Sequence, residues 1–498
     1  MNVNPITRLD YPDPDVIRVE DTYYMVSTTM HFMPGCEILQ SFDLVHWEHV
    51  TYVYETLDHT DAQQLKSGQN IYGQGMWAAS LRYHEGRFCI CFVANDTRKT
   101  YLYTSEKIDG PWKKQLIEGF YHDGSLLFDE DGRNYIVYGN DEIWITELNE
   151  DLTAPKKDGL HRLLVSDHKN PELGYEGSHI QKINGYYYIF LIHSLRDRWM
   201  RTEACFYSDS LEGEFTGGDV LCDDRGYCGQ GVAQGGIVDT PDGKWYAMLF
   251  QDSGAVGRIP ILLPVTWKDH FPAFGQNGHV PEEIEVHSTR PGYIYQPLVG
   301  SDDFCNGLLP RWQFNHDPDP RYYHLDALQG TYTITTREVC TELTQAVNTL
   351  TQRMSYPSCA AEVTVDASAL KEGDVAGLCA LQSCYAAVGI IKHHGKYEVL
   401  MLDKKEDGIL DMTEGTVVES HQMDFRLEAD FCNMKDEARC YYRVNKGDWL
   451  PIGTVHKLYF KLDHFTGCRF GLFCYAAEET GGSACFRDFK YYDVDEIS

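Results

Sequence analysis

The sequence lacks long apolar runs and is poor in positive charge. No uninterrupted apolar stretch approaches the about 18 residues that cross a bilayer, and segment 1–9 has no basic region followed by an apolar run. We therefore expect a protein that is neither membrane-spanning nor secreted, and we predict a cytoplasmic location.

Basic residues are outnumbered, with 43 Lys and Arg against 75 Asp and Glu and a formal net charge of -32. Such a surface repels phosphate backbones and anionic lipid, which excludes nucleic acid and membranes as expected partners. Neutral ligands such as sugars are not repelled, although acidic surfaces are also common on proteins without such a ligand. Association into a homo-oligomer is left open.

Several chemical motifs are also missing. The 16 cysteines are scattered without a C-x-x-C pair, so we expect free thiols in a reducing compartment. No G-x-S-x-G supports a serine hydrolase. Gly229-Gln230-Gly231 has no following helix for a nucleotide loop, and Asp129-Glu130-Asp131-Gly132 is too short for a calcium loop and fits a hairpin turn.

The sequence does contain a repeated hairpin. Each copy has an apolar strand, a tight turn with Gly or an acidic residue, and a strand rich in aromatic residues, which make up 13% of the chain. Turns such as Asn184-Gly185 supply the positive φ that short hairpins need. Five copies occur, at residues 16–26, 81–90, 126–137, 180–189 and 237–248.

The spacing of the copies, roughly 45 to 65 residues, fits a four-stranded sheet per repeat in a radial arrangement. We predict an all-β protein in which residues 1–300 form a five-bladed β-propeller. The repeat stops near residue 302, and alternating strands continue after it. We assign residues 301–498 to a concanavalin-like β-sandwich.

Acidic side chains stand where the innermost strands of the blades begin. Because these strands start at one rim of the channel, the residues before them should converge, and three of the five are carboxylates. The five are Asp13, Trp77, Asp123, Glu176 and Gln234. Asp before a strand is often only a turn residue, but three acids at equivalent blade starts are better explained by a shared site.

Clustered carboxylates push their pKa values apart, as glycoside hydrolysis requires. One carboxylic acid protonates the leaving oxygen, while an ionised one activates water or attacks the sugar. The three acids therefore favour a glycosidase.

The motifs around the acids resemble glycoside hydrolase family 43. Asp13 lies in Tyr11-Pro12-Asp13-Pro14-Asp15, Asp123 in Asp123-Gly124-Ser125-Leu126, and Glu176 in Glu176-Gly177-Ser178-His179. Further motifs at 312–316 and 348–353 are similar to the β-xylosidase/α-L-arabinofuranosidase branch. The resemblance implies that Asp13 is the general base, Glu176 the general acid and Asp123 the residue that orients Glu176 and adjusts its pKa, with inversion at the anomeric carbon.

The resemblance also implies substrate-binding residues. Trp77 matches an aromatic wall for the sugar, and Arg258 matches an arginine that bonds the substrate and keeps Asp13 ionised. Gln234 stands where many members have a histidine, which in some relatives holds calcium. We therefore expect no required cofactor and at most a weak structural calcium in the channel. Phe32, in Met30-His31-Phe32, is predicted to contact the sugar, in a wall less aromatic than usual.

We predict an exo-acting hydrolase that releases terminal xylose or arabinofuranose from short xylan- or arabinan-derived oligosaccharides. The alternative is a non-catalytic carbohydrate-binding propeller, which would tolerate the loss of the acids. A glycoside phosphorylase would need a phosphate site, which Arg258 alone does not form.

Overall fold

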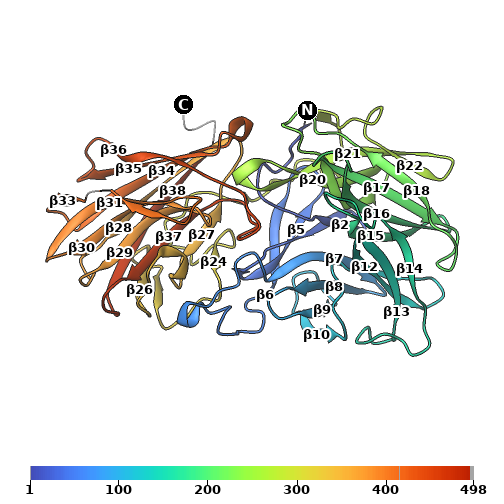
Figure 1. Cartoon of the computed structure of the whole chain (residues 1–498), viewed down its shortest axis with the longest axis horizontal. Helices are drawn as coiled ribbons and strands as arrows, with labels where there is room; N and C mark the ends of the chain where they lie inside the picture. The colour runs from blue at the N-terminus through green and yellow to red at the C-terminus, as the bar shows by residue number, and fades with distance from the viewer. Residues whose placement is uncertain (1, 414, 494–498) are drawn as a thin grey trace.

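The computed structural model describes residues 2–413 and 415–493, and it shows two lobes made of β-strands (Figure 1). Within these residues the helices are short 3-10 turns: η1 (Lys66–Gly68), η2 (Gly254–Val256), η3 (Leu343–Gln345) and η4 (Cys432–Met434). No helix among them is long and apolar enough to span a membrane. The predicted all-β class, five-bladed propeller and following sandwich are confirmed.

The propeller consists of five four-stranded antiparallel sheets. Blade one contains β2 (Asp15–Val19), β3 (Thr22–Ser27), β5 (Gly35–Ser41) and β6 (Glu48–Tyr54). Blade two contains β7 (Met76–His84), β8 (Arg87–Ala94), β9 (Lys99–Ser105) and β10 (Lys113–Ile117), and blade three contains β11 (Ser125–Phe128), β12 (Asn134–Asn140), β13 (Glu142–Leu148) and β14 (His161–Ser166). Blade four contains β15 (Glu176–Ile183), β16 (Tyr186–Ser194), β17 (Arg201–Ser208) and β18 (Thr216–Leu221), and blade five contains β19 (Val232–Asp239), β20 (Trp245–Asp252), β21 (Arg258–Lys268) and β22 (Phe271–Phe274).

The predicted turns join the two inner strands of each blade. Asn184 and Gly185 have φ of 52° and 85° between β15 and β16, and Glu85 and Gly86 have φ of 49° and 76° between β7 and β8. Two successive positive φ angles match the right-handed twist of the paired strands. The first strands of the blades, β2, β7, β11, β15 and β19, contact one another in a closed ring around the axis.

The second lobe packs two large sheets face to face. One contains β4 (Phe32–Met33), β24 (Gln313–Asn315), β27 (Leu350–Arg353), β29 (Asp374–Leu381), β30 (Ala386–His393), β31 (Lys396–Lys404), β32 (Leu410–Met412), β33 (Thr416–Val418) and β37 (Arg469–Ala476). The other contains β25 (Tyr323–Asp326), β26 (Thr331–Thr335), β28 (Ser358–Asp366), β34 (Gln422–Asp430), β35 (Glu437–Val444), β36 (Leu450–Lys457) and β38 (Ser483–Asp493). A large cluster of buried apolar side chains, including Leu378, Phe425 and Phe470, fills the sandwich.

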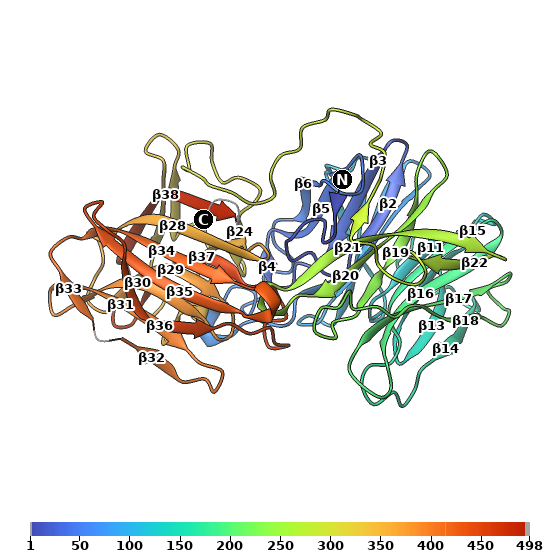
Figure 2. The same cartoon turned by 90° about the horizontal axis from the view of Figure 1, so that it is seen from above.

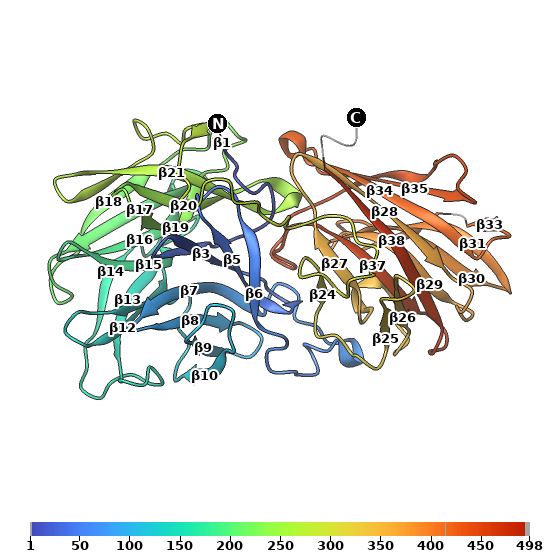
Figure 3. The same ribbon diagram turned by 180° about the vertical axis from the view of Figure 1, so that it is seen from behind.

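The chain crosses between the lobes after β23 (Glu283–Ile284), which pairs with β1 (Asn2–Val3) on the propeller. The crossing segment runs along the outside of the molecule (Figure 2). The boundary at residue 300 stays a prediction. One exchange was not foreseen: β4, which precedes most of the propeller strands, pairs with β24 and extends a sheet of the sandwich, and β24 and β27 lie on the side of the sandwich that faces the propeller (Figure 3).

Buried charges join the lobes. Arg353 of β27 forms an ion pair of 2.9 Å with Glu37 of β5, and their side chains are 4% and 2% exposed. Asp10 accepts hydrogen bonds from the N–H groups of Arg258 and Gly467, each at 2.7 Å. A Cβ atom on Gly467 would lie 2.2 Å from the carbonyl oxygen of Val256. Glycine at 467 therefore lets a sandwich loop approach the propeller backbone.

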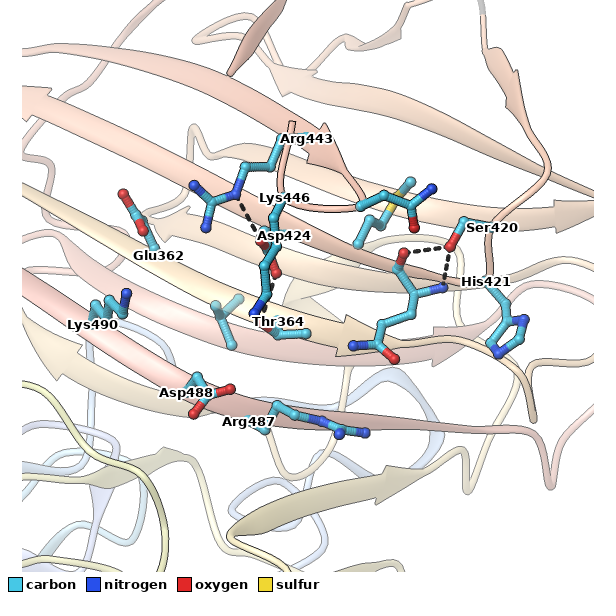
Figure 4. Close-up of a pocket in the computed structure, with 14 residues that line it drawn as sticks. Glu362, Thr364, Ser420, His421, Asp424, Arg443, Lys446, Arg487, Asp488 and Lys490 are labelled. Atoms are coloured by element: carbon cyan, nitrogen blue, oxygen red, sulfur yellow. Dashed lines mark hydrogen bonds and ion pairs between the residues drawn. The ribbon is translucent and has the colours of Figure 1, made fainter. Parts of the chain in front are cut away.

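The outer face of the seven-stranded sheet carries a groove of about 830 Å³ lined by charged side chains (Figure 4). Two of its carboxylates are paired: Asp424 accepts hydrogen bonds from Thr364 at 2.6 Å and from Arg443 at 2.7 Å, and Glu362 pairs with Arg426 at 2.6 Å. These two acids therefore already have partners. All 16 cysteines are free, as predicted.

Candidate active site

The three acids stand at the starts of inner strands, and two of them have left-handed backbone conformations. Asp13 and Asp123 have φ of 53° and 48°, and each lies two residues before its strand, β2 or β11. Glu176 is the first residue of β15, and the left-handed residue there is the following Gly177, with φ of 63°. The predicted equivalence of the three positions is therefore wrong by one residue for Glu176, which occupies the level of the residue before each Asp.

Asp13 is buried between a cation and a hydroxyl. Its side chain accepts a hydrogen bond of 2.9 Å from Arg258 Nη1 and one of 2.6 Å from Thr28 Oγ1. Arg258 opens β21 in blade five and is 2% exposed, so the ion pair is shielded from water. A buried carboxylate needs such partners to remain charged.

Asp123 and Glu176 both lie beside His122. Asp123 Oδ2 accepts the N–H of Gly177 at 3.1 Å, and Glu176 Oε2 accepts a hydrogen bond of 2.7 Å from Asn140 of β12. His122 Nε2 lies 3.6 Å from a carboxylate oxygen of each acid. Burial, together with the charges of Glu176 and Asp13, raises the pKa of Asp123 to about 6, although His122 opposes the shift.

His122 is a site residue that the sequence analysis missed. The charge of Asp123, aided by Glu176 and Asp13, outweighs burial and raises the pKa of His122 to about 9. An imidazolium therefore sits between two carboxyl groups at neutral pH. Its position in the chain could have identified it. His122 comes directly before a residue with left-handed backbone, as Glu176 does, and side chains at this position reach the site.

The aromatic side of the site draws on both lobes. Trp77 of β7 lies 6.0 Å from the ring of His122 and 5.4 Å from the ring of Phe465, measured between centroids. Phe465 belongs to the loop between β36 and β37 of the sandwich, and the guanidinium of Arg258 lies 4.2 Å from its centroid. Trp77 and Arg258 thus converge with the acids, and Phe465 joins them. The strand pattern of the blades could not predict Phe465, because contacts between the two lobes bring its loop to the site.

Gln234 lies next to the acids without extending into open space. It is 4% exposed and has φ of 58°, and a Cβ atom on Gly177 would lie 2.7 Å from its side-chain carbons. Its N–H donates to Glu203 Oε2 at 2.7 Å. Glu203 is fully buried, and burial raises its pKa well above the usual range. Gln234 therefore supports the segment that carries Glu176.

Phe32 is placed elsewhere. It lies on β4, is 2% exposed, and is covered by the guanidinium of Arg469 at 3.4 Å from its ring centroid. His31 beside it is fully buried in an aromatic cluster with Tyr72 and His464, where burial lowers the pKa of its ring well below the usual value. The predicted sugar-facing wall at Met30-His31-Phe32 is packed between the lobes, and the structure does not bring Phe32 together with the acids.

The residues of the channel are a poor fit to calcium. Asp15, at the start of β2, is its buried carboxylate, and its oxygens already accept hydrogen bonds from the Leu81 N–H at 2.7 Å and from Arg82 at 2.8 Å, and lie 3.1 Å from His179 Nδ1. Cationic and N–H donors thus occupy the positions that a hard cation would need. Ligand atoms of His122, Asp123 and Glu176 lie within 4.8 Å of one another, but the raised pKa of His122 favours a protonated ring, which is not a ligand.

Comparisons with known proteins identify the family of the chain and agree with its two-lobed fold. The family model described as glycosyl hydrolases family 43 matches residues 3–272, and a model described as the β-xylosidase C-terminal concanavalin A-like domain matches residues 301–492. A β-xylosidase of Formosa agariphila is 26% identical over 99% of this chain and 89% of its own.

Two solved structures extend these matches. A bifunctional GH43-CE protein of Bacteroides eggerthii is 42% identical with a TM-score of 0.92, and the match covers 99% of this chain and 63% of that longer chain. An engineered GH43 hydrolase with endo-xylanase and exo-arabinofuranosidase activity is 27% identical with a TM-score of 0.86, and the match covers 99% of both chains.

Proposed function

Because the chain belongs to glycosyl hydrolases family 43, we propose that it is an exo-acting enzyme that removes terminal xylose or arabinofuranose from short xylan- or arabinan-derived oligosaccharides, with inversion. The observation that carries the proposal is the arrangement of two unlike carboxyl environments around one space. Asp13 is paired with a buried arginine, whereas Asp123 and Glu176 share a histidine.

The two environments suit opposite tasks. Asp13, held as a carboxylate by Arg258 and Thr28, accepts a proton from a water molecule, whose oxygen bonds to the anomeric carbon. Glu176 donates its proton to the glycosidic oxygen as the bond from the anomeric carbon to that oxygen breaks. Asp123 lies beside both His122 and Glu176, with ligand atoms of the three within 4.8 Å of one another, and tunes the charge that Glu176 experiences. The products are a free sugar and the shortened alcohol.

The sandwich supports action at chain ends. Phe465 enters the site from the second lobe and contacts both Trp77 and Arg258. A site walled by another domain accommodates a terminal ring better than the middle of a polymer. Relatives are named β-xylosidase and non-reducing end α-L-arabinofuranosidase, and these names define the two sugars to be compared.

The proposal is tested by incubating the enzyme with xylo-oligosaccharides and arabinoxylo-oligosaccharides and following the products by proton NMR. We expect one monosaccharide, xylose or arabinose, released from chain ends with the anomeric configuration opposite to that of the bond cleaved. Release of internal fragments, or no monosaccharide from either substrate, would contradict the proposal.

We further propose that hydrolysis requires no metal. The charges of the site are balanced by Arg258 and His122, and Asp15 in the channel is bonded to Arg82 and Leu81. Dialysis against EDTA should leave kcat/KM within about twofold, since no acid–base group would be lost. A large loss that calcium restores would show that an ion is needed.

A further inference from the structure

Trp199 is exposed on the same end of the propeller as the acids. It lies in the loop 195–200, which joins β16 to β17 in blade four, and its side chain is 43% exposed. All nine tryptophans of the chain lie in the described residues, and Trp199 is the only one classed as exposed. An exposed indole offers a large, rigid apolar face to a ligand.

Strand register places this loop near Glu176. Glu176 pairs with Ile192 of β16, and Ile192 pairs with Glu203 of β17. The two strands run only two residues further, to the Ser194–Arg201 pair, before the loop begins. Glu176 and the β17 end of the loop are thus two strand spacings and two residues apart in one sheet, about 12 Å.

The indole is held in place by its neighbours. The Arg201 guanidinium lies 5.4 Å from the Trp199 ring and 5.1 Å from the ring of Phe250, and Arg201 is fixed by an ion pair of 2.8 Å with Asp252. The Phe250 ring in turn lies 5.3 Å from Arg258, which bonds Asp13. A continuous set of packed groups therefore connects the exposed ring to the proposed base.

The loop itself is also fixed. The hydroxyl of Ser194 accepts the N–H of Met200 at 2.8 Å, the N–H of Leu195 bonds the Met200 carbonyl at 3.1 Å, and Arg196 pairs with Asp167 of the loop before β15. A ring held in this way loses little further freedom when a ligand covers it.

We propose that Trp199 is the stacking platform for a leaving-group sugar of the oligosaccharide, so that the enzyme binds substrate on both sides of the bond it cleaves. The inference rests on the proposed function, because Glu176 as the acid places the leaving oxygen, and hence the sugars beyond it, on the blade-four side. A pyranose ring presents an apolar C–H face to an indole and hydroxyls to the water around it.

The test compares Trp199→Ala with Trp199→Phe and with Tyr83→Ala. Tyr83 is a matched control, since its ring is 44% exposed and it lines a cavity of about 450 Å³ at the opposite end of the channel. Each variant is assayed on the nitrophenyl glycoside that the wild type cleaves and on the matching tetrasaccharide. Trp199→Ala should lower kcat/KM for the tetrasaccharide about tenfold, mainly through KM, and leave the nitrophenyl glycoside within twofold. Trp199→Phe should recover most of the loss, and Tyr83→Ala should change neither substrate.

Equal losses on both substrates, or no loss on either, would overturn the platform. A wild type that cleaves no glycoside would contradict the proposed function instead. In that case quenching of tryptophan fluorescence by xylotetraose and by an arabino-tetrasaccharide decides the inference: binding of either that Trp199→Ala weakens supports it, and binding of neither, or binding left unchanged by the substitution, overturns it.

Discussion

The acidic site of the propeller and the groove of the sandwich are both rich in charged side chains, but these side chains are arranged differently in the two regions. In the groove, Asp424 and Glu362 have near partners on adjacent strands, and regular strand backbone carries them (Figure 4). In the propeller, Asp13 and Asp123 sit in left-handed backbone, and the pKa of Asp123 rises to about 6 because it is buried beside other acids.

The difference shows that an abundance of charge does not identify the functional region. The groove is lined by charged side chains, yet its carboxylates Asp424 and Glu362 already have arginine partners. The propeller site keeps like charges together, and two of its acids, Asp13 and Asp123, have left-handed backbone, which costs on the order of 1–3 kcal/mol each. Like charges that are held close together indicate a catalytic site better than charges that are paired with opposite ones.

The largest effect is expected from a substitution that removes the proposed general base, Asp13. Asp13→Asn should reduce kcat/KM about 10³-fold on every glycoside, because among the described residues no other carboxylate bonds the guanidinium of Arg258. Steady-state kinetics on the substrates above measure it. The matched change Asp424→Asn in the groove, which also removes one arginine-bonded carboxylate, should leave kcat/KM within twofold. A similar loss in both variants would contradict the contrast.

A smaller effect is expected where the sandwich reaches into the site. Phe465→Ala should lower kcat/KM about tenfold, because Arg258 and Trp77 lose an aromatic neighbour. Leu462→Ala, on the same loop with a side chain that is 75% exposed, is the control and should have no effect. Full activity in Phe465→Ala would mean that the second lobe takes no part in the chemistry.

The smallest effect concerns stability and pH. The pKa of His122 rises from 6.5 to about 9 on folding, so its stabilising contribution is complete below pH 6.5 and is lost as the pH rises through about 9. The loss is on the order of 3 kcal/mol. The raised pKa of Asp123 affects stability in a separate pH range, between 3.8 and about 6. Urea midpoints at pH 6.5 and 9 measure the change.

His122→Asn should flatten this pH dependence, whereas His287→Asn, on a side chain that is 69% exposed, should not. An unchanged slope in His122→Asn would show that the histidine is not charged in the folded protein.

The fold was predictable because its signal is local and repeated. Turns such as Asn184-Gly185 require positive φ at two successive residues, and each specifies a hairpin wherever it occurs. Five hairpins with the same pattern of apolar and aromatic strands, at similar spacing, leave few radial arrangements. The pairing of β4 with β24 was not predictable, because Phe32 and Met33 follow no repeat and their partner lies far away in the sequence.

The site was predictable only in part, for the same reason. Asp13, Asp123 and Glu176 could be located from the repeat, but the one-residue offset of Glu176 depends on bulges such as that between Glu176 and His179, which no pattern of apolar residues marks. Phe465 depends on the approach of two lobes at Gly467, and Phe32 was misplaced because the same packing buries it. Contacts between distant segments, rather than local propensity, decided these residues.

The most direct test of the central claim is the leaving-group dependence of Glu176→Gln, which removes the acid and keeps the amide able to bond Asn140. On the sugar that the wild type accepts, kcat/KM for the disaccharide should fall about 10³-fold, and kcat/KM for the nitrophenyl glycoside, whose leaving group needs little protonation, should fall less than about tenfold. Equal losses on the two substrates would contradict the role of Glu176 as the acid and the reading of the three carboxylates as one catalytic site.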